Sequence, residues 1–141
     1  MAGRNREIGP RIVLGLIGIV AVVTGANVGF GGIATLGLEG PRDFFQVLDR
    51  PLFDMHDSHA RYLGGLWLGM GLLFLAATVR LGPLRPAVLA ALALMFVGGL
   101  SRLTQGGLAG FASPLVGISF AAEMILVPAT FWRVWVGGKA G

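Results

Sequence analysis

One acidic side chain stands alone in a long apolar stretch near the end of the chain. An ionised carboxylate such as Glu123 is costly in hydrocarbon, so such a residue is usually paired, protonated or lines a cavity. Two arginines, Arg102 and Arg61, lie at the ends of other apolar stretches and are its expected partners. With Ser119 one helical turn before Glu123, and Trp67 inside another stretch, they predict one polar pocket.

Two interpretations of this set stay open. In the first, Glu123 and an arginine form a structural ion pair that fixes the register of the helices. In the second, the two arginines receive an anionic or carbonyl-bearing ligand, and Glu123 holds or relays a proton. Pro128, which removes a helical hydrogen-bond donor close to Glu123, would open space for such a pocket.

A second cluster has the residue types that bind a metal ion. Carboxylate and neutral imidazole suit zinc or manganese, and both occur within six residues. The candidates are Asp54, His56, Asp57 and His59. A solvated polar cluster at a membrane interface explains the same residues, so no metal site is predicted.

Most other chemistry is not indicated by the sequence. The chain has no cysteine, which excludes disulfides and thiolate catalysis. No serine–histidine–acid arrangement or phosphate-binding loop is present, and no basic run with interleaved aromatics predicts nucleic-acid binding. We expect no cofactor; whether the chain is an enzyme stays open, with a non-enzymatic role favoured.

The composition indicates a membrane protein. Of the 141 residues, 55% are apolar and 13% charged, whereas soluble domains carry about 25% charged residues. We predict a single integral membrane domain over residues 1–141. It has an all-α fold: a four-helix transmembrane bundle, with a short interfacial helix in the polar first external loop, Leu38 to His59. The predicted helices cover about 11–32, 60–80, 86–105 and 114–135.

Small residues recur on the predicted helices at the spacing that lets two helices approach closely. On the first they are Gly18, Val22, Gly25, Gly29 and Gly32. A cleaved signal peptide is the alternative for this stretch, but a discarded segment needs no such face. On the second helix, the face predicted to point into the bundle consists of Arg61, Gly65, Gly69 and Leu72.

Basic residues near the helix ends predict the orientation. They are Arg4, Arg6, Arg11, Arg80, Arg85, Arg133 and Lys139. All fall on one side of a four-pass chain, which the positive-inside rule makes cytoplasmic, together with both termini. Trp132 and Trp135 mark the membrane interface on that side.

Three short motifs together resemble a known family of small bacterial membrane proteins. They are Asp57-Ser58-His59 with Arg61-Tyr62, then Gly65 to Leu72, and Gly98 to Arg102 followed by the helix from Pro114 to Glu123. The family has four predicted helices and is known only as a domain of unknown function, and it is loosely similar to DoxX-type membrane proteins. The resemblance implies a multi-pass protein of the bacterial inner membrane and says nothing about chemistry.

Two functions follow from these observations. The first is a non-enzymatic accessory or subunit protein that binds lipid, a small hydrophobic ligand or partner membrane subunits, including copies of itself. The alternative is a small transporter or channel with a polar path at Glu123, Arg102 and Arg61. A continuous polar route would favour transport, but below Glu123 the last helix offers only Thr130.

Overall fold

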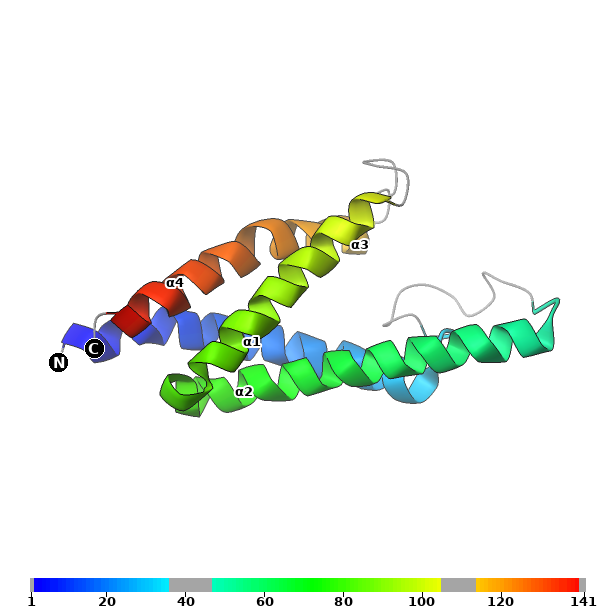
Figure 1. Cartoon of the computed structure of the whole chain (residues 1–141), viewed down its shortest axis with the longest axis horizontal. Helices are drawn as coiled ribbons and strands as arrows, with labels where there is room; N and C mark the ends of the chain where they lie inside the picture. The colour runs from blue at the N-terminus through cyan, green and yellow to red at the C-terminus, as the bar shows by residue number, and fades with distance from the viewer. Residues whose placement is uncertain (1, 36–46, 105–113, 140–141) are drawn as a thin grey trace. The chain divides into compact units, whose positions relative to one another are not determined.

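The computed structural model describes residues 2–35, 47–104 and 114–139, and all regular structure in these three segments is helical. The elements in chain order are α1 (Ala2–Gly31), α2 (Arg50–Ser101), the 3-10 helix η2 (Arg102–Thr104), α3 (Pro114–Ala121), the π-helix η4 (Ala122–Leu126) and α4 (Val127–Lys139) (Figure 1). For the part of the chain that is described, the predicted all-α class is confirmed.

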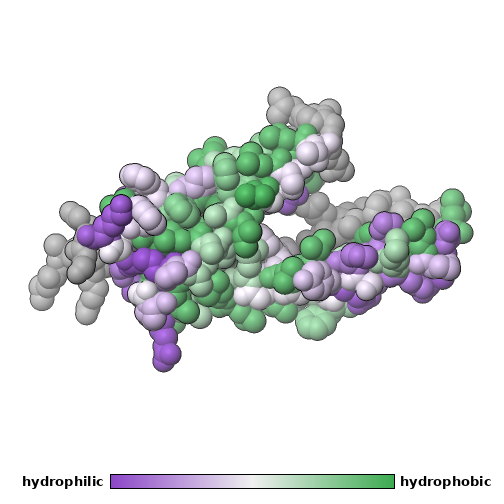
Figure 2. Space-filling model, in the orientation of Figure 1, coloured by the Kyte–Doolittle hydropathy of each residue, from purple (hydrophilic) through white to green (hydrophobic). Residues whose placement is uncertain are grey.

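Three of the described helical runs are long and apolar enough to cross a membrane. They are Glu7–Gly31, Arg50–Thr104 and Pro114–Lys139, with 25, 55 and 26 residues. Hydrophobic side chains cover much of the helices on the face drawn in Figure 2. Many of them are exposed, Ile12, Leu66 and Ile125 among them, as expected of helices that face lipid.

The ends of α1 and the start of α2 differ from the predicted boundaries. α1 begins at Ala2, well before residue 11, and ends at Gly31, after which Gly32 adopts φ +75° and closes the helix as a left-handed C-cap. α2 begins at Arg50, because the carboxylate of Asp49 accepts the N–H of Leu52 at 3.0 Å, as a capping residue does.

This early start of α2 bears on the predicted interfacial helix. Residues 36–46 lie outside the described residues. Residues 50–59 run directly into the rest of α2, so this part of the predicted loop does not form a separate helix.

α2 consists of two helical segments, 50–79 and 81–101, that meet at Arg80, where φ −123° and ψ 48° leave the helical region. Pro83 has no N–H to give to the carbonyl of Val79. The Nη1 of Arg11 instead donates to the carbonyls of Thr78, at 2.9 Å, and Val79, at 3.2 Å. The cation of α1 therefore caps the end of the first segment.

By their packing, the residues form two compact units. Unit 2 is Gly15–Leu75, and unit 1 combines Met1–Leu14 with Ala76–Gly141. Within unit 2, a Cβ built at Gly64 would collide with the backbone nitrogen of Gly29, and one at Gly25 with that of Leu68. The glycine face predicted for the first helix is therefore confirmed as a close helix contact.

The face predicted for the second helix is wrong at its two glycines. Gly65 and Gly69 are exposed, and no heavy atom of the described residues lies within 4 Å of a Cβ built at either one. Gly64, one position earlier, is buried against α1 instead. Glycines at 64, 65, 69 and 71 supply small residues on two sides of this helix, so spacing alone did not identify the packed side.

Candidate functional site

Glu123 lies in the only π-helical turn among the described residues. It belongs to η4, where the N–H of Val127 bonds to the carbonyl of Ala122, five residues back. Pro128 follows at once and has no N–H for the carbonyl of Met124, so the widened turn stands where the α-helical pattern is already broken. Such turns occur frequently at functional sites.

The carboxylate of Glu123 is held by Arg102 in a two-point contact. Nε of Arg102 donates to Oε2 at 2.8 Å, and Nη2 donates to Oε1 at 3.0 Å. The side chain of Glu123 is 12% exposed and that of Arg102 is 41% exposed. Charge-assisted bonds with this fork geometry are the strong kind, and they balance a carboxylate that would be costly alone in hydrocarbon.

A glycine makes room for this ion pair. A Cβ built at Gly99, on the second segment of α2, would lie 2.7 Å from Cβ and 3.0 Å from Oε2 of Glu123. It would also lie 2.5 Å from the Cε of Met124. The pair of Gly99 and Arg102, three residues apart, therefore supplies both the space and the charge that Glu123 requires.

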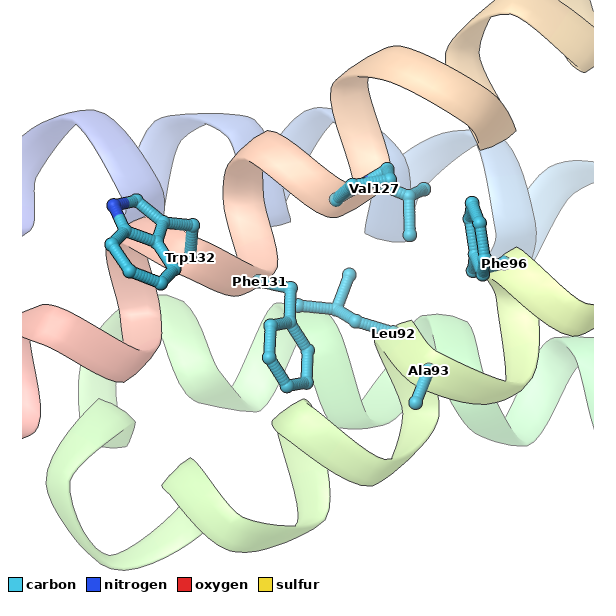
Figure 3. Close-up of a pocket in the computed structure, with 7 residues that line it drawn as sticks. Leu92, Ala93, Phe96, Val127, Phe131 and Trp132 are labelled. Carbon is cyan, nitrogen blue, oxygen red and sulfur yellow. The ribbon is translucent and has the colours of Figure 1, made fainter.

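An apolar pocket lies next to the pair in unit 1, with a volume of about 250 Å³. We call this cavity the apolar pocket. It is lined by Leu92, Ala93, Phe96, Val127, Pro128, Phe131 and Trp132. Side chains of α2 and α4 project into one space between the two helices (Figure 3). Val127 is one helical turn after Glu123, so the ion pair lies at one end of this pocket.

The structure assigns the other predicted pocket residues different surroundings. Ser119 is half-buried on α3, one turn before Glu123. Arg61 and Trp67 belong to unit 2 and have partners there. Arg61 bonds through Nε to Asp57 at 2.6 Å and through Nη1 to the carbonyl of Phe30 at 2.5 Å.

Trp67 bonds across the close helix contact of unit 2. Its Nε1 donates to the hydroxyl of Thr24 at 2.9 Å, and that hydroxyl donates to the carbonyl of Val20 at 2.8 Å. Of the five residues predicted to form one pocket, the structure thus shows contact between Arg102 and Glu123, while Arg61 and Trp67 tie α2 to α1.

The metal candidates are engaged in local contacts. Asp54 pairs with Arg50 at 3.1 Å, and Asp57 accepts the N–H of Ile33 at 2.7 Å in addition to bonding Arg61. His59 Nδ1 lies 2.8 Å from the carbonyl of Met55, and His56 is exposed. Among the described residues, no three acidic or histidine side chains form a group that could hold a metal ion.

The sequence interpretation missed a charged network in unit 1. Glu7 bonds to Arg11 at 2.9 Å and to Arg85 at 2.5 Å. Arg85 also lies against Gly138, where an added Cβ would collide with Nη1. The four-residue spacing of Glu7 and Arg11 on a helix could have predicted their ion pair. No sequence pattern predicts the bond between Glu7 and Arg85, because 78 residues separate these partners.

Residues 10–134 match a family model described as Domain of unknown function (DUF4345), and the chain belongs to that family. This match confirms the resemblance to a domain of unknown function. No curated protein and no solved structure matches the chain.

Proposed function

We propose that the chain is a multi-pass membrane protein, without catalytic activity of its own, that binds a lipid or a small hydrophobic ligand in the apolar pocket. The pocket carries this proposal. Its lining consists of aliphatic and aromatic residues with no charged side chain, and Ala93 and the 64%-exposed Trp132 are exposed residues of this lining. Apolar pockets with polar groups nearby are the usual form of small-molecule sites.

Four membrane crossings are the arrangement that fits this function best. Arg50–Thr104 has 55 residues, or about 80 Å as a helix, against about 30 Å of hydrocarbon. The break at Arg80 and the proline at position 83 support two crossings by α2, one for each of its segments. α1 and the run from Pro114 to Lys139 would supply the other two crossings.

The proposed location is the inner membrane of a bacterium, with both termini in the cytoplasm. The basic residues of unit 1, including Arg11, Arg85 and Lys139, support this orientation through the positive-inside rule. Fusing a phosphatase or a fluorescent protein to the C-terminus tests it, because the phosphatase is active only outside the cytoplasm. Strong phosphatase activity of the fusion would reverse the orientation.

Ligand binding is tested by filling the pocket. Native mass spectrometry of the protein released from mild detergent should show a lipid or small hydrophobic molecule bound to the wild type. Ala93→Trp places an indole in the pocket and should remove most of that bound mass. Ala129→Trp is the matched control, since Ala129 is exposed on α4 and does not line the pocket.

Both variants must elute from the detergent column as the wild type does, which excludes misfolding as the cause of the loss. Equal retention of the ligand by both variants would contradict binding in this pocket.

Transport remains the second candidate, and the π-turn at Glu123 favours it because such turns mark places where a helix can change its pattern. In this candidate, separation of Arg102 from Glu123 would open a polar path. Proteoliposomes that hold a pH-sensitive dye would report proton flux, which Glu123→Gln should abolish. Flux that is absent in the wild type would remove this candidate and leave the binding function untouched.

Association with itself or with other membrane subunits is the third part of the proposal. Gly65 and Gly69 are exposed four residues apart, the spacing of small residues that lets transmembrane helices pack closely. Gly65→Leu should then lower the yield of chemical cross-links between copies of the chain. An unchanged cross-linking pattern would exclude this face as the contact.

A further inference from the structure

We infer that the occupant of the apolar pocket is one chain of an anionic phospholipid, whose phosphate lies at Lys139 at the end of α4. This inference rests on the proposed function and names the class of ligand. It comes from the order of residues along the two helices that form the pocket, from the charges where these helices end, and from the size of the pocket.

The α4 wall changes from apolar to aromatic to charged in one direction. Pro128, Trp132, Trp135 and Lys139 follow one another at spacings of four, three and four residues and therefore share one face of the helix. The first two line the pocket. Beyond them, the ammonium of Lys139 lies 4.7 Å from the centre of the Trp135 ring, in a cation–π contact that holds it beside the aromatic surface.

The α2 wall has the same order. Phe96, Leu92, Leu89 and Arg85 are also separated by four, three and four residues, so that this face too runs from the pocket to a cation. Arg85 lies against Gly138, next to Lys139 in the chain. Both walls of the pocket thus lead to positive charge at the same end of unit 1.

Positive charges outnumber negative ones in the network of Glu7, Arg11 and Arg85. Glu7 is shared between Arg11 and Arg85, so the three side chains together keep one positive charge. Lys139 adds a second and is exposed. Hydrophilic residues gather around the end of α4 in Figure 2. An anionic headgroup complements this surplus, whereas a zwitterionic headgroup brings its own positive charge.

The dimensions fit one lipid chain with its headgroup outside the pocket. Lys139 follows Pro128 by eleven residues, which is about 16 Å along a helix and close to half of the roughly 30 Å hydrocarbon thickness. The pocket holds about 250 Å³, below the roughly 300–1,000 Å³ of sites that enclose a whole drug-sized ligand. Since its lining has no charged residue, the polar part of the ligand must lie elsewhere, and Lys139 is where both walls lead.

The test compares two lipids that differ only in the headgroup. The delipidated protein in mild detergent is titrated with phosphatidylglycerol or with phosphatidylcholine of identical chains, and bound lipid is counted by native mass spectrometry. The wild type should prefer phosphatidylglycerol, and Lys139→Gln should reduce that preference about fivefold, the effect of one cation near a charged headgroup. Lys139→Arg should keep it.

Arg133→Gln is the matched control, because it removes the same charge from the same helix but from a residue off the face that leads out of the pocket. Equal loss of preference in Arg133→Gln and Lys139→Gln would overturn the inference, since it would show attraction by net charge alone. Equal binding of both lipids by the wild type would also overturn it.

Ala93→Trp separates a failure of this inference from a failure of the proposed function. If it blocks both lipids while the wild type shows no headgroup preference, the pocket binds a chain but does not select an anionic lipid. If it blocks neither lipid, the pocket is not the binding site, and both proposals fail.

Discussion

The two units hold their helices together by opposite means. In unit 2, α1 and the first segment of α2 touch backbone to backbone, because Gly25, Gly29 and Gly64 have no side chains to separate them. In unit 1, whole side chains stand between α4 and the second segment of α2, and they leave an apolar pocket beside an ion pair. One contact excludes any added atom, and the other has space for a ligand.

This contrast has a physical reason. In lipid, helices associate through van der Waals contact and hydrogen bonds, since lipid tails are as apolar as the side chains themselves. Backbone contact at glycines brings two helices closest together and so gives extensive van der Waals contact. Side chains around a pocket make fewer such contacts with each other, and a two-point ion pair such as Arg102–Glu123 supplies hydrogen bonds instead. A lipid chain in the pocket would restore the lost contacts.

Gly64→Val should have the largest effect on stability. Its Cβ would meet the backbone nitrogen of Gly29, which cannot move aside as the end of a side chain can. Overpacking of this kind costs about 1–3 kcal/mol of unfolding free energy, and the clash with backbone places this variant near the upper value. Gly65→Val is the matched control one residue away, since no described atom lies near its added Cβ, and its effect should stay within about 0.5 kcal/mol.

Reversible unfolding in mixed detergent micelles measures both variants. Comparable destabilisation by the two would show that valine weakens this helix wherever it is placed, and the distinction between the packed and the exposed side would be lost.

Glu123→Gln tests the other side of the comparison and should rank second. The substitution keeps the shape and removes the charge, so Arg102 loses a charge-assisted partner at a cost of about 2 kcal/mol. Arg102→Gln should cost a similar amount. The double variant should cost less than the sum, because both single substitutions break the same ion pair. Strictly additive losses would mean that the two side chains are stabilised by separate contacts.

Much of the helical fold could be predicted because it depends on local pattern. The apolar stretches and the spacing of Gly18, Gly25 and Gly29 were enough to indicate the helices and the close contact made by the first. The contact between Glu123 and Arg102 could also be anticipated, since a lone carboxylate in an apolar helix requires a partner. Arg102 itself lies in the 3-10 helix that directly follows α2.

Two features of the candidate site were not predicted: the partner of Arg61 and the apolar pocket. The sequence interpretation expected Arg61 to pair with Glu123, but the structure pairs it with Asp57, four residues earlier on the same helix, at 2.6 Å. A local pair of this kind needs no chain reversal, whereas a pair with Glu123 would require a specific arrangement of distant segments. The apolar pocket was equally hidden, because Leu92 and Phe131 look like ordinary packing residues until two helices bring them together.

The smallest effect is expected from the hydrogen bond that crosses the glycine contact. Trp67→Phe removes the donor to Thr24, and Thr24→Val removes the acceptor while keeping the shape. If these helices cross a membrane, as we propose, such a bond should contribute about 0.6 kcal/mol, the average in double-mutant cycles on a membrane protein. If the coupling between the two substitutions is that small, the backbone contact at Gly64 carries most of the stability of unit 2. A coupling of several times this size would instead make Trp67 the main tie between α1 and α2.

Neither substitution should alter lipid retention, because both residues belong to unit 2 and the apolar pocket belongs to unit 1. A loss of bound lipid in Trp67→Phe, with its folding intact, would therefore break the separation between a unit that only packs and a unit that also binds.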